Sequence, residues 1–137
     1  MREPRNLEVT DLSLNLAELV YRVTKGFPLD ERFGLVAQMR RAAVSVGSNI
    51  SEGCGRSTDR AFANCIENAL SEVLEVDFQA QVALRLGHGD PGLLQELRGG
   101  TDQLKRMLAS LSAAVRRKKA TAPLVGPHRV PRRRRLS

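Results

Sequence analysis

The chain has 137 residues, 42% of them hydrophobic and 4% aromatic, and this length suits one domain with a modest core. No run of about eighteen apolar residues occurs, which excludes a membrane-spanning helix, and two cysteines are too few for a disulfide scaffold. The formal net charge is +7, but nine basic and no acidic residues lie from Arg116 onward. Thirteen basic and fifteen acidic residues remain before it, so the basic character belongs to the C-terminal tail.

The apolar residues are mainly Leu, Val and Ala, and there is no Trp, which favours helix packing over a β-sheet. The N-terminal residues lead straight into an amphipathic segment without the apolar block of a signal peptide. Together with the low cysteine count, this predicts a cytoplasmic protein.

Two helices are predicted in the first part of the chain, where apolar residues recur at spacings of three and four. The first covers about 8–25 and ends at Gly26, Phe27 and Pro28, because Pro cannot continue the helical hydrogen bonds. The second is expected to open near Asp30 and to break at 53–55, where two glycines flank a cysteine. The inward-facing residues are Leu12, Leu16, Leu19, Val20 and Val23 in the first helix, and Leu35, Met39, Ala42, Val46 and Ile50 in the second.

The third predicted helix has the most regular pattern and runs to about Leu86. Ser57, Thr58 and Asp59 are each suitable N-caps for it. Its apolar spacing alternates between four and three, as close antiparallel packing requires. The residues on this seam are Phe62, Ile66, Ala69, Val73, Val76, Ala80 and Ala83.

A second apolar row follows the same helix, through Leu70, Leu74, Phe78, Val82 and Leu86. At 100° per residue, Phe78 and Val82 lie roughly opposite Phe62. One interpretation is an additional interface, most simply self-association, formed by Leu70, Leu74, Phe78 and Val82. The other is a central helix that its own bundle buries on all sides.

The segment 86–92 is a predicted turn, and a fourth helix follows over about 93–118. Gly99 and Gly100 predict a kink or a short separate first piece. The bundle domain is therefore expected to cover 1–118. The remaining segment, 119–137, is Pro-rich and basic and is predicted to be disordered when free. The inward-facing residues of the fourth helix are Leu97, Leu104, Leu108, Leu111 and Val115.

The stretch from Phe27 to Phe62 reads FPLDERFGLVAQMRRAAVSVGSNISEGCGRSTDRAF. It resembles the bacterial "four helix bundle protein" family, first noticed as proteins encoded by intervening sequences in large-subunit ribosomal RNA genes. The resemblance covers roughly 7–88. The matching positions are Phe27, Pro28, Glu31, Gly34, Leu35, Gln38, Arg40, Arg41, Ala42, Ser45, Asn49, Ile50, Glu52, Gly53, Arg56 and Phe62.

The resemblance implies an all-α fold, an antiparallel up-and-down four-helix bundle that assembles into a homopentameric ring. A related branch serves as the accessory variability protein of diversity-generating retroelements, where the pentamer binds the reverse transcriptase and its RNA through basic surfaces. Those properties are what the resemblance implies for this chain: a homopentamer, RNA as a partner and a reverse transcriptase as a further one.

Arg40 and Arg41 border the apolar stripe of the second predicted helix, and Arg56 and Arg60 follow at the next turn. Clusters of this kind around a ring would bind phosphate, for which Arg is well suited. The alternative, which the pattern favours, is a set of ion pairs within the bundle to Glu52, Glu31 or Glu72.

The tail is the stronger candidate for nucleic-acid contact, because phosphate backbones attract basic segments without sequence specificity. A contact with an acidic protein, or a purely solubilising role, remains as an alternative. The basic residues of this segment are Arg116, Arg117, Lys118, Lys119, Arg129, Arg132, Arg133, Arg134 and Arg135.

Catalysis has little support in the sequence. His88 and His128 are the only histidines, and neither cysteine has a histidine beside it to activate a thiolate. Cys54 and Cys65 are expected to lie too far apart for one zinc ion. We therefore expect no enzyme, metal site or cofactor. The leading hypothesis is an oligomeric accessory protein that binds nucleic acid, RNA rather than DNA, and the alternative is a protein–protein scaffold.

Overall fold

A computed structural model of the chain describes the backbone of residues 4–120 and the side chains of residues 8–118. Its elements are α1 (Pro4–Thr24), a short 3-10 helix η1 (Leu29–Glu31), α2 (Leu35–Cys54), α3 (Asp59–Leu86) and α4 (Pro91–Ala120). No strand occurs among these residues, which confirms the all-α class. None of the four helices combines the length and apolarity that crossing a membrane would require. Of the predicted tail, 119–137, the backbone of the first two residues belongs to α4, and the rest lies outside the described residues.

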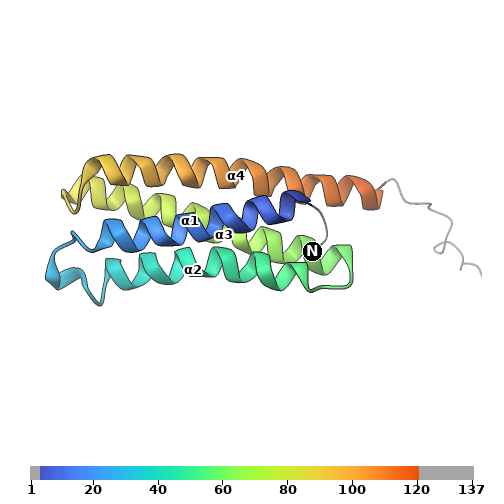
Figure 1. Ribbon diagram of the computed structural model, residues 1–137, viewed down its shortest axis with the longest axis horizontal. Coiled ribbons are helices and arrows are strands. Elements are labelled where there is room, and N and C mark those ends of the chain that lie inside the picture. Colours follow the sequence, from blue (N-terminus) through green and yellow to red (C-terminus); the bar gives the residue numbers. More distant parts are fainter. Residues whose placement is uncertain (1–3, 121–137) are drawn as a thin grey trace, which may run out of the picture.

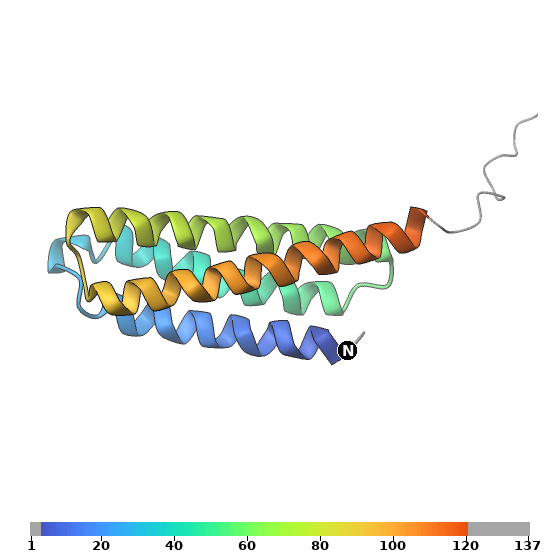
Figure 2. The same ribbon diagram turned by 90° about the horizontal axis from the view of Figure 1, so that it is seen from above.

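The four helices run alternately up and down and pack side by side along their lengths (Figures 1 and 2). Each helix packs against the next in the chain, and α1 also packs against α4, which closes the bundle. The α1–α2 and α3–α4 turns therefore share one end, which we call the turn end. The α2–α3 turn lies at the opposite end, beside the start of α1 and the last turns of α4.

The predicted apolar stripes form the core. All seven seam residues of α3, from Phe62 to Ala83, are buried, as are the central residues of the stripes on α1 and α2. Leu12, Leu35 and Val115 are only partly buried, at the edge of the core. The periodicity of the sequence thus identified the inner face of each helix correctly.

The start of α2 differs from the prediction. The chain around Asp30 forms one turn of 3-10 helix, and α2 itself begins only at Leu35. A side-chain oxygen of Glu31 accepts a hydrogen bond from the Leu35 amide at 3.2 Å. Glu31 therefore satisfies one of the free amides at the start of α2, as a capping residue does.

The other helix ends follow ordinary capping chemistry. Of the three candidate caps for α3, Thr58 is the one used, and its hydroxyl accepts a hydrogen bond from the Ala61 amide at 3.1 Å. At the start of α4, Asp90 accepts one from the Leu93 amide at 2.9 Å. The fourth helix continues without interruption through Gly99 and Gly100, so the short separate first piece predicted there is wrong.

Candidate nucleic-acid interface

Five basic side chains gather at the end of the bundle that carries the α2–α3 turn. Arg56 and Arg60 lie at this turn and at the start of α3, and the last turns of α4 extend past it (Figures 1 and 2). All five side chains are exposed. We call this group the basic end; it consists of Arg56, Arg60, Arg116, Arg117 and Lys118.

Three of these cations have acidic partners. Arg56 forms an ion pair with Glu52 one turn earlier on α2. The Arg116 Nε donates a hydrogen bond to Glu67 Oε2 at 2.9 Å, linking α4 to α3. The Lys118 ammonium lies 3.9 Å from an Asp59 carboxylate oxygen. Each pair is largely exposed to solvent, so its contribution to stability is small.

The carboxylate of Glu67 is held in the ionised form. Hydrogen bonding from Arg116 is the main cause that lowers the pKa of Glu67 below its ordinary value of 4.5, and a bond from the Ser112 hydroxyl adds to it. That hydroxyl donates at 3.0 Å. Glu67 therefore stays charged at neutral pH and neutralises part of the basic end.

Arg60 and Arg117 differ from the other members of the basic end. Neither has an acidic partner among the side chains of 8–118, and both are exposed. They leave uncompensated positive charge where α4 leads into the basic tail. The remaining predicted contacts lie outside the described side chains; they are Lys119, Arg132, Arg133, Arg134 and Arg135.

The structure places Arg40 away from the basic end, in the half of the bundle near the turn end. Its guanidinium carbon lies 4.3 Å from the centre of the Tyr21 ring. Its Nε donates a hydrogen bond to the Thr24 hydroxyl at 2.9 Å, and that hydroxyl in turn donates to the Val20 carbonyl at 2.7 Å. These contacts brace α2 against α1.

Arg41 also bonds within the bundle, where it donates to Glu75 of α3 at 3.2 Å. The expected partners were Glu31, Glu52 and Glu72, and of these only Glu52 pairs with one of the named arginines, Arg56. Periodicity could not distinguish Glu75 from Glu72, because both lie on the side of α3 next to α2. Arg40 and Arg41 thus both make contacts within the bundle, and their role in nucleic-acid binding stays a prediction.

A partly buried polar group surrounds the Arg41 contact. Gln79 is 5% exposed, and its side-chain amide donates to Glu75 at 3.1 Å. Burial, together with the neighbouring Glu75, raises the pKa of Glu72 above its ordinary value of 4.5. One side-chain oxygen of Glu72 and one of Gln79 are buried without a hydrogen-bond partner. No sequence pattern indicated this group, because its members occupy positions that resemble the ordinary polar surface of a helix.

A second constellation missed by the sequence lies at the turn end. A ring nitrogen of His88 is 3.1 Å from a Glu31 oxygen, and the His88 ring centre is 5.7 Å from that of Phe27. The Leu35 amide, and next to it His88, lowers the pKa of Glu31 below its ordinary value of 4.5. This cluster ties the α1–α2 turn to the α3–α4 turn.

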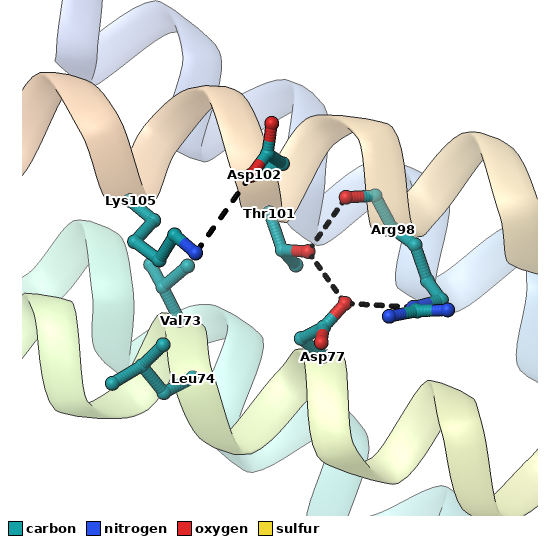
Figure 3. Close-up of a pocket in the computed structure, with 7 residues that line it drawn as sticks. All are labelled: Val73, Leu74, Asp77, Arg98, Thr101, Asp102 and Lys105. Atoms are coloured by element: carbon teal, nitrogen blue, oxygen red, sulfur yellow. Dashed lines mark hydrogen bonds and ion pairs between the residues drawn. The ribbon is translucent and has the colours of Figure 1, made fainter.

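A pocket of about 210 Å³ lies between α3 and α4 (Figure 3). Asp77 of α3 points to α4, where it accepts hydrogen bonds from Arg98 Nε and the Thr101 hydroxyl, each at 3.0 Å. Partial burial acts to raise the pKa of Asp77, but the bonds from Arg98, Thr101 and Gln81 outweigh it and lower the pKa. These polar side chains satisfy one another's hydrogen bonds. They join α3 to α4 at the edge of the pocket.

The predicted oligomer interface is partly exposed. Phe78 is 66% and Leu74 is 49% exposed, while Leu70 and Val82 at the ends of the row are half-buried. Leu70 packs against the core. The bundle therefore does not bury α3 on all sides, and the interpretation of α3 as a fully buried central helix is wrong.

Neither cysteine forms a disulfide, and Cys54 is half-buried while Cys65 is buried. Across residues 4–120, no three His, Cys, Asp or Glu side chains lie close enough together to hold a metal ion.

A solved structure from Bacteroides thetaiotaomicron, a protein of unknown function from the S23 ribosomal protein family, shares the fold. Its TM-score is 0.73 at 21% sequence identity, and the alignment covers 79% of this chain and 97% of that one. No curated protein matches the chain. The model of the 23S rRNA-intervening sequence protein family matches residues 5–110, most of the length. This protein therefore belongs to the 23S rRNA-intervening sequence protein family.

Proposed function

We propose that the protein is a non-enzymatic accessory protein of the cytoplasm that binds RNA through the basic end and the tail that follows it. The observation that carries this proposal is the uncompensated charge of Arg60 and Arg117 at the point where α4 leads into a segment without acids. Arg binds phosphate through two parallel hydrogen bonds, and release of counterions from the backbone adds a term independent of sequence. RNA is preferred to DNA because the family takes its name from a ribosomal RNA gene element.

The finer parts of the proposal rest on the resemblance of the sequence to this family. They are assembly into a homopentameric ring and contact with a reverse transcriptase, as in diversity-generating retroelements. A ring would repeat the basic end, and several copies on one RNA raise the effective concentration of each contact. The exposed Leu74 and Phe78 support self-association, because apolar side chains of this size gain free energy when they leave water.

A protein–protein scaffold without a nucleic-acid role is the second candidate. The exposed apolar side chains favour it, since they lie on the helix faces and at the turn end, away from the basic end. In that case neutralising the basic end would leave partner binding unchanged.

The test is binding of a labelled structured RNA across salt concentrations from about 50 to about 200 mM. The variant Arg60→Gln/Arg117→Gln removes two cations that have no partner among the described residues. We expect weaker binding and a salt slope that is smaller by about 2, one for each lost phosphate contact. In a second variant, Arg132 to Arg135 are replaced by Gln. Its loss of RNA binding gives the contribution of the tail to the affinity.

The matched control is Arg32→Gln/Arg85→Gln, which removes the same charge near the turn end from side chains that are also exposed. We expect this control to bind RNA nearly as the unchanged protein does, because charges beyond a Debye length of about 10 Å are screened. Equal losses in both variants would show attraction by net charge alone. No salt-dependent binding by any form would refute the proposal and favour the scaffold.

A further inference from the structure

Two hollows follow each other along the outer seam between α1 and α4. One of about 280 Å³ lies near the basic end, and one of about 460 Å³ lies nearer the turn end. The buried side chains of Val9 and Leu111 form the apolar floor of the first hollow. Leu16 and Gly100 line the second, where the glycine leaves the α4 wall low. We call the two hollows together the α1–α4 trough.

The α1 wall of the trough carries acidic side chains that the fold leaves unpaired. Glu8 lines the first hollow, Glu18 lines the second, and Asp11 comes between them in the chain. Their spacings of three and seven residues place these side chains along one face of the helix. All three are exposed, and none of them has an ion pair or hydrogen bond with another described residue.

The cations that line the trough already have acidic partners. An Arg106 nitrogen donates a hydrogen bond to Asp102 at 2.6 Å. An Arg22 nitrogen lies 3.8 Å from a carboxylate oxygen of Glu96. These pairs leave the acids of the α1 wall uncompensated, so the trough combines apolar hollows with negative charge.

The part of the tail from residue 121 onward has the complementary character. It contains five arginines and no acid, and Leu124 and Val125 precede the arginines. Its three prolines favour an extended chain, which advances about 3.1 Å per residue. Helix α4 ends beside the start of α1 (Figures 1 and 2), so this segment follows directly from the mouth of the trough.

The order of residues in the tail matches the order of the hollows. At 1.5 Å per residue along α4, the first hollow lies about 14–21 Å back from Ala120 and the second about 26–36 Å. An extended chain that turns back at Ala120 reaches about 12–16 Å at Leu124 and Val125. It reaches about 28–46 Å at Arg129 to Arg135. The apolar pair therefore reaches the apolar hollow, and the first arginines reach Glu18.

We propose that the tail folds back into the α1–α4 trough of its own chain and that RNA must displace it from there. Leu124 and Val125 cover the first hollow, and the arginines pair with the acids of the α1 wall. Exposed ion pairs are individually weak, so the contact is reversible. The docked arginines are not free for phosphate, and the trough thus weakens attraction to any RNA. This role in regulation rests on the proposed function, whereas the docking itself does not.

The first measurement is the rate at which trypsin cleaves the tail of the full chain, followed by mass spectrometry. When docking is fast, this rate follows the fraction of tail that is undocked. The trough variant is Glu8→Gln/Glu18→Gln. The control is Asp30→Lys, which makes the same change of net charge at an exposed position of the turn end.

At about 50 mM salt we expect the tail of the trough variant to be cleaved about threefold to tenfold faster than that of the unchanged protein and of the control. The difference should vanish at about 1 M salt, where charges beyond about 3 Å are screened. Equal cleavage rates in the trough variant and the unchanged protein would overturn the docking. An equally fast control would also overturn it, because net charge alone would then set the rate.

The second measurement is RNA binding by four full-length forms in a double-mutant cycle. They are the unchanged protein, the trough variant, the tail variant with Arg132 to Arg135 replaced by Gln, and the combination of both. If RNA must displace the tail, the trough variant binds RNA more tightly by about the factor by which its cleavage rises. In the tail variant the same change at the trough should add much less.

An equal gain in both backgrounds would overturn the competition, since it would show that the acids of the trough repel RNA directly. Absence of RNA binding by every form would refute the proposed function, and with it the regulatory role. The docking would then be decided by the cleavage rates alone, so the two failures are distinguishable.

Discussion

The two ends of the bundle differ in how far their charged side chains have partners within the fold. At the turn end, Glu31 satisfies an amide of α2 and contacts His88, which packs beside Phe27, so this acid is engaged within the fold. At the basic end, cations outnumber the acids that face them, and Arg60 and Arg117 have no partner among the described residues. The acid at the turn end therefore stabilises the fold, whereas the basic end carries two cations that form no ion pair in the described part of the chain.

Gly89 at the turn end has a left-handed backbone, with a φ of +72°. An added Cβ would lie 2.7 Å from a carbon of the Phe27 ring. We expect Gly89→Ala to lower the free energy of unfolding by about 2–4 kcal/mol, since a left-handed backbone strains Ala and the ring is displaced. Urea unfolding measures this change.

Two other glycines provide graded controls for that substitution. Gly87 has the same φ of +72° but open space around it, so Gly87→Ala should cost only about 1 kcal/mol. Gly99 lies inside α4 with open space, and Gly99→Ala should stabilise the protein by about 0.5–1 kcal/mol. Equal effects at Gly87 and Gly89 would show that the contact with Phe27 contributes nothing.

Acidification should weaken the turn end through Glu31. A carboxyl group whose pKa is lower in the folded chain adds stability above its unfolded pKa, and this stability is lost as the pH falls through the folded pKa. Since the pKa of Glu31 is lowered from 4.5, Glu31→Gln should be less stable than the unchanged protein at pH 7. The difference in the free energy of unfolding between the variant and the unchanged protein should become smaller below about pH 4.

The measurement is urea unfolding at several pH values. Glu18→Gln is the matched control, because Glu18 is exposed and no partner for it occurs among the described residues. This control should differ little in stability from the unchanged protein at pH 7, because surface charges contribute little to stability. The difference in the free energy of unfolding between Glu31→Gln and the unchanged protein could instead stay constant down to about pH 3. That result would mean that the charge of Glu31 does not stabilise the turn end.

The fold was predictable because burial in a helix bundle follows the apolar period. The seam on α3 was placed residue by residue, from Phe62 to Ala83, since each spacing of three or four returns to the same face. Gly99 and Gly100 misled, because the packing of α4 against α3 and α1 outweighs the low helix propensity of glycine. The late start of α2 also escaped, as it depends on a hydrogen bond from the Leu35 amide to Glu31.

The candidate site was predictable only in outline. The sequence indicated Arg56, Arg60 and the basic segment as separate features, and the up-and-down topology brings them to one end. It could not show that Arg116 faces Glu67, because the two residues are far apart in the sequence and meet through the rotation of α4 against α3.

The smallest effect that we expect is the change in RNA binding when one acidic residue of the bundle is neutralised. Glu67→Gln removes the acid that engages Arg116, and this frees one more cation for phosphate. We expect RNA binding to tighten about threefold to tenfold at low salt, with a slope steeper by up to about 1. The pair is exposed, so stability should change by no more than about 1 kcal/mol. Glu31→Gln makes the same change of net charge at the turn end. If it tightened binding equally, the attraction would come from the total charge; if Glu67→Gln alone does so, Arg116 contacts RNA at the basic end.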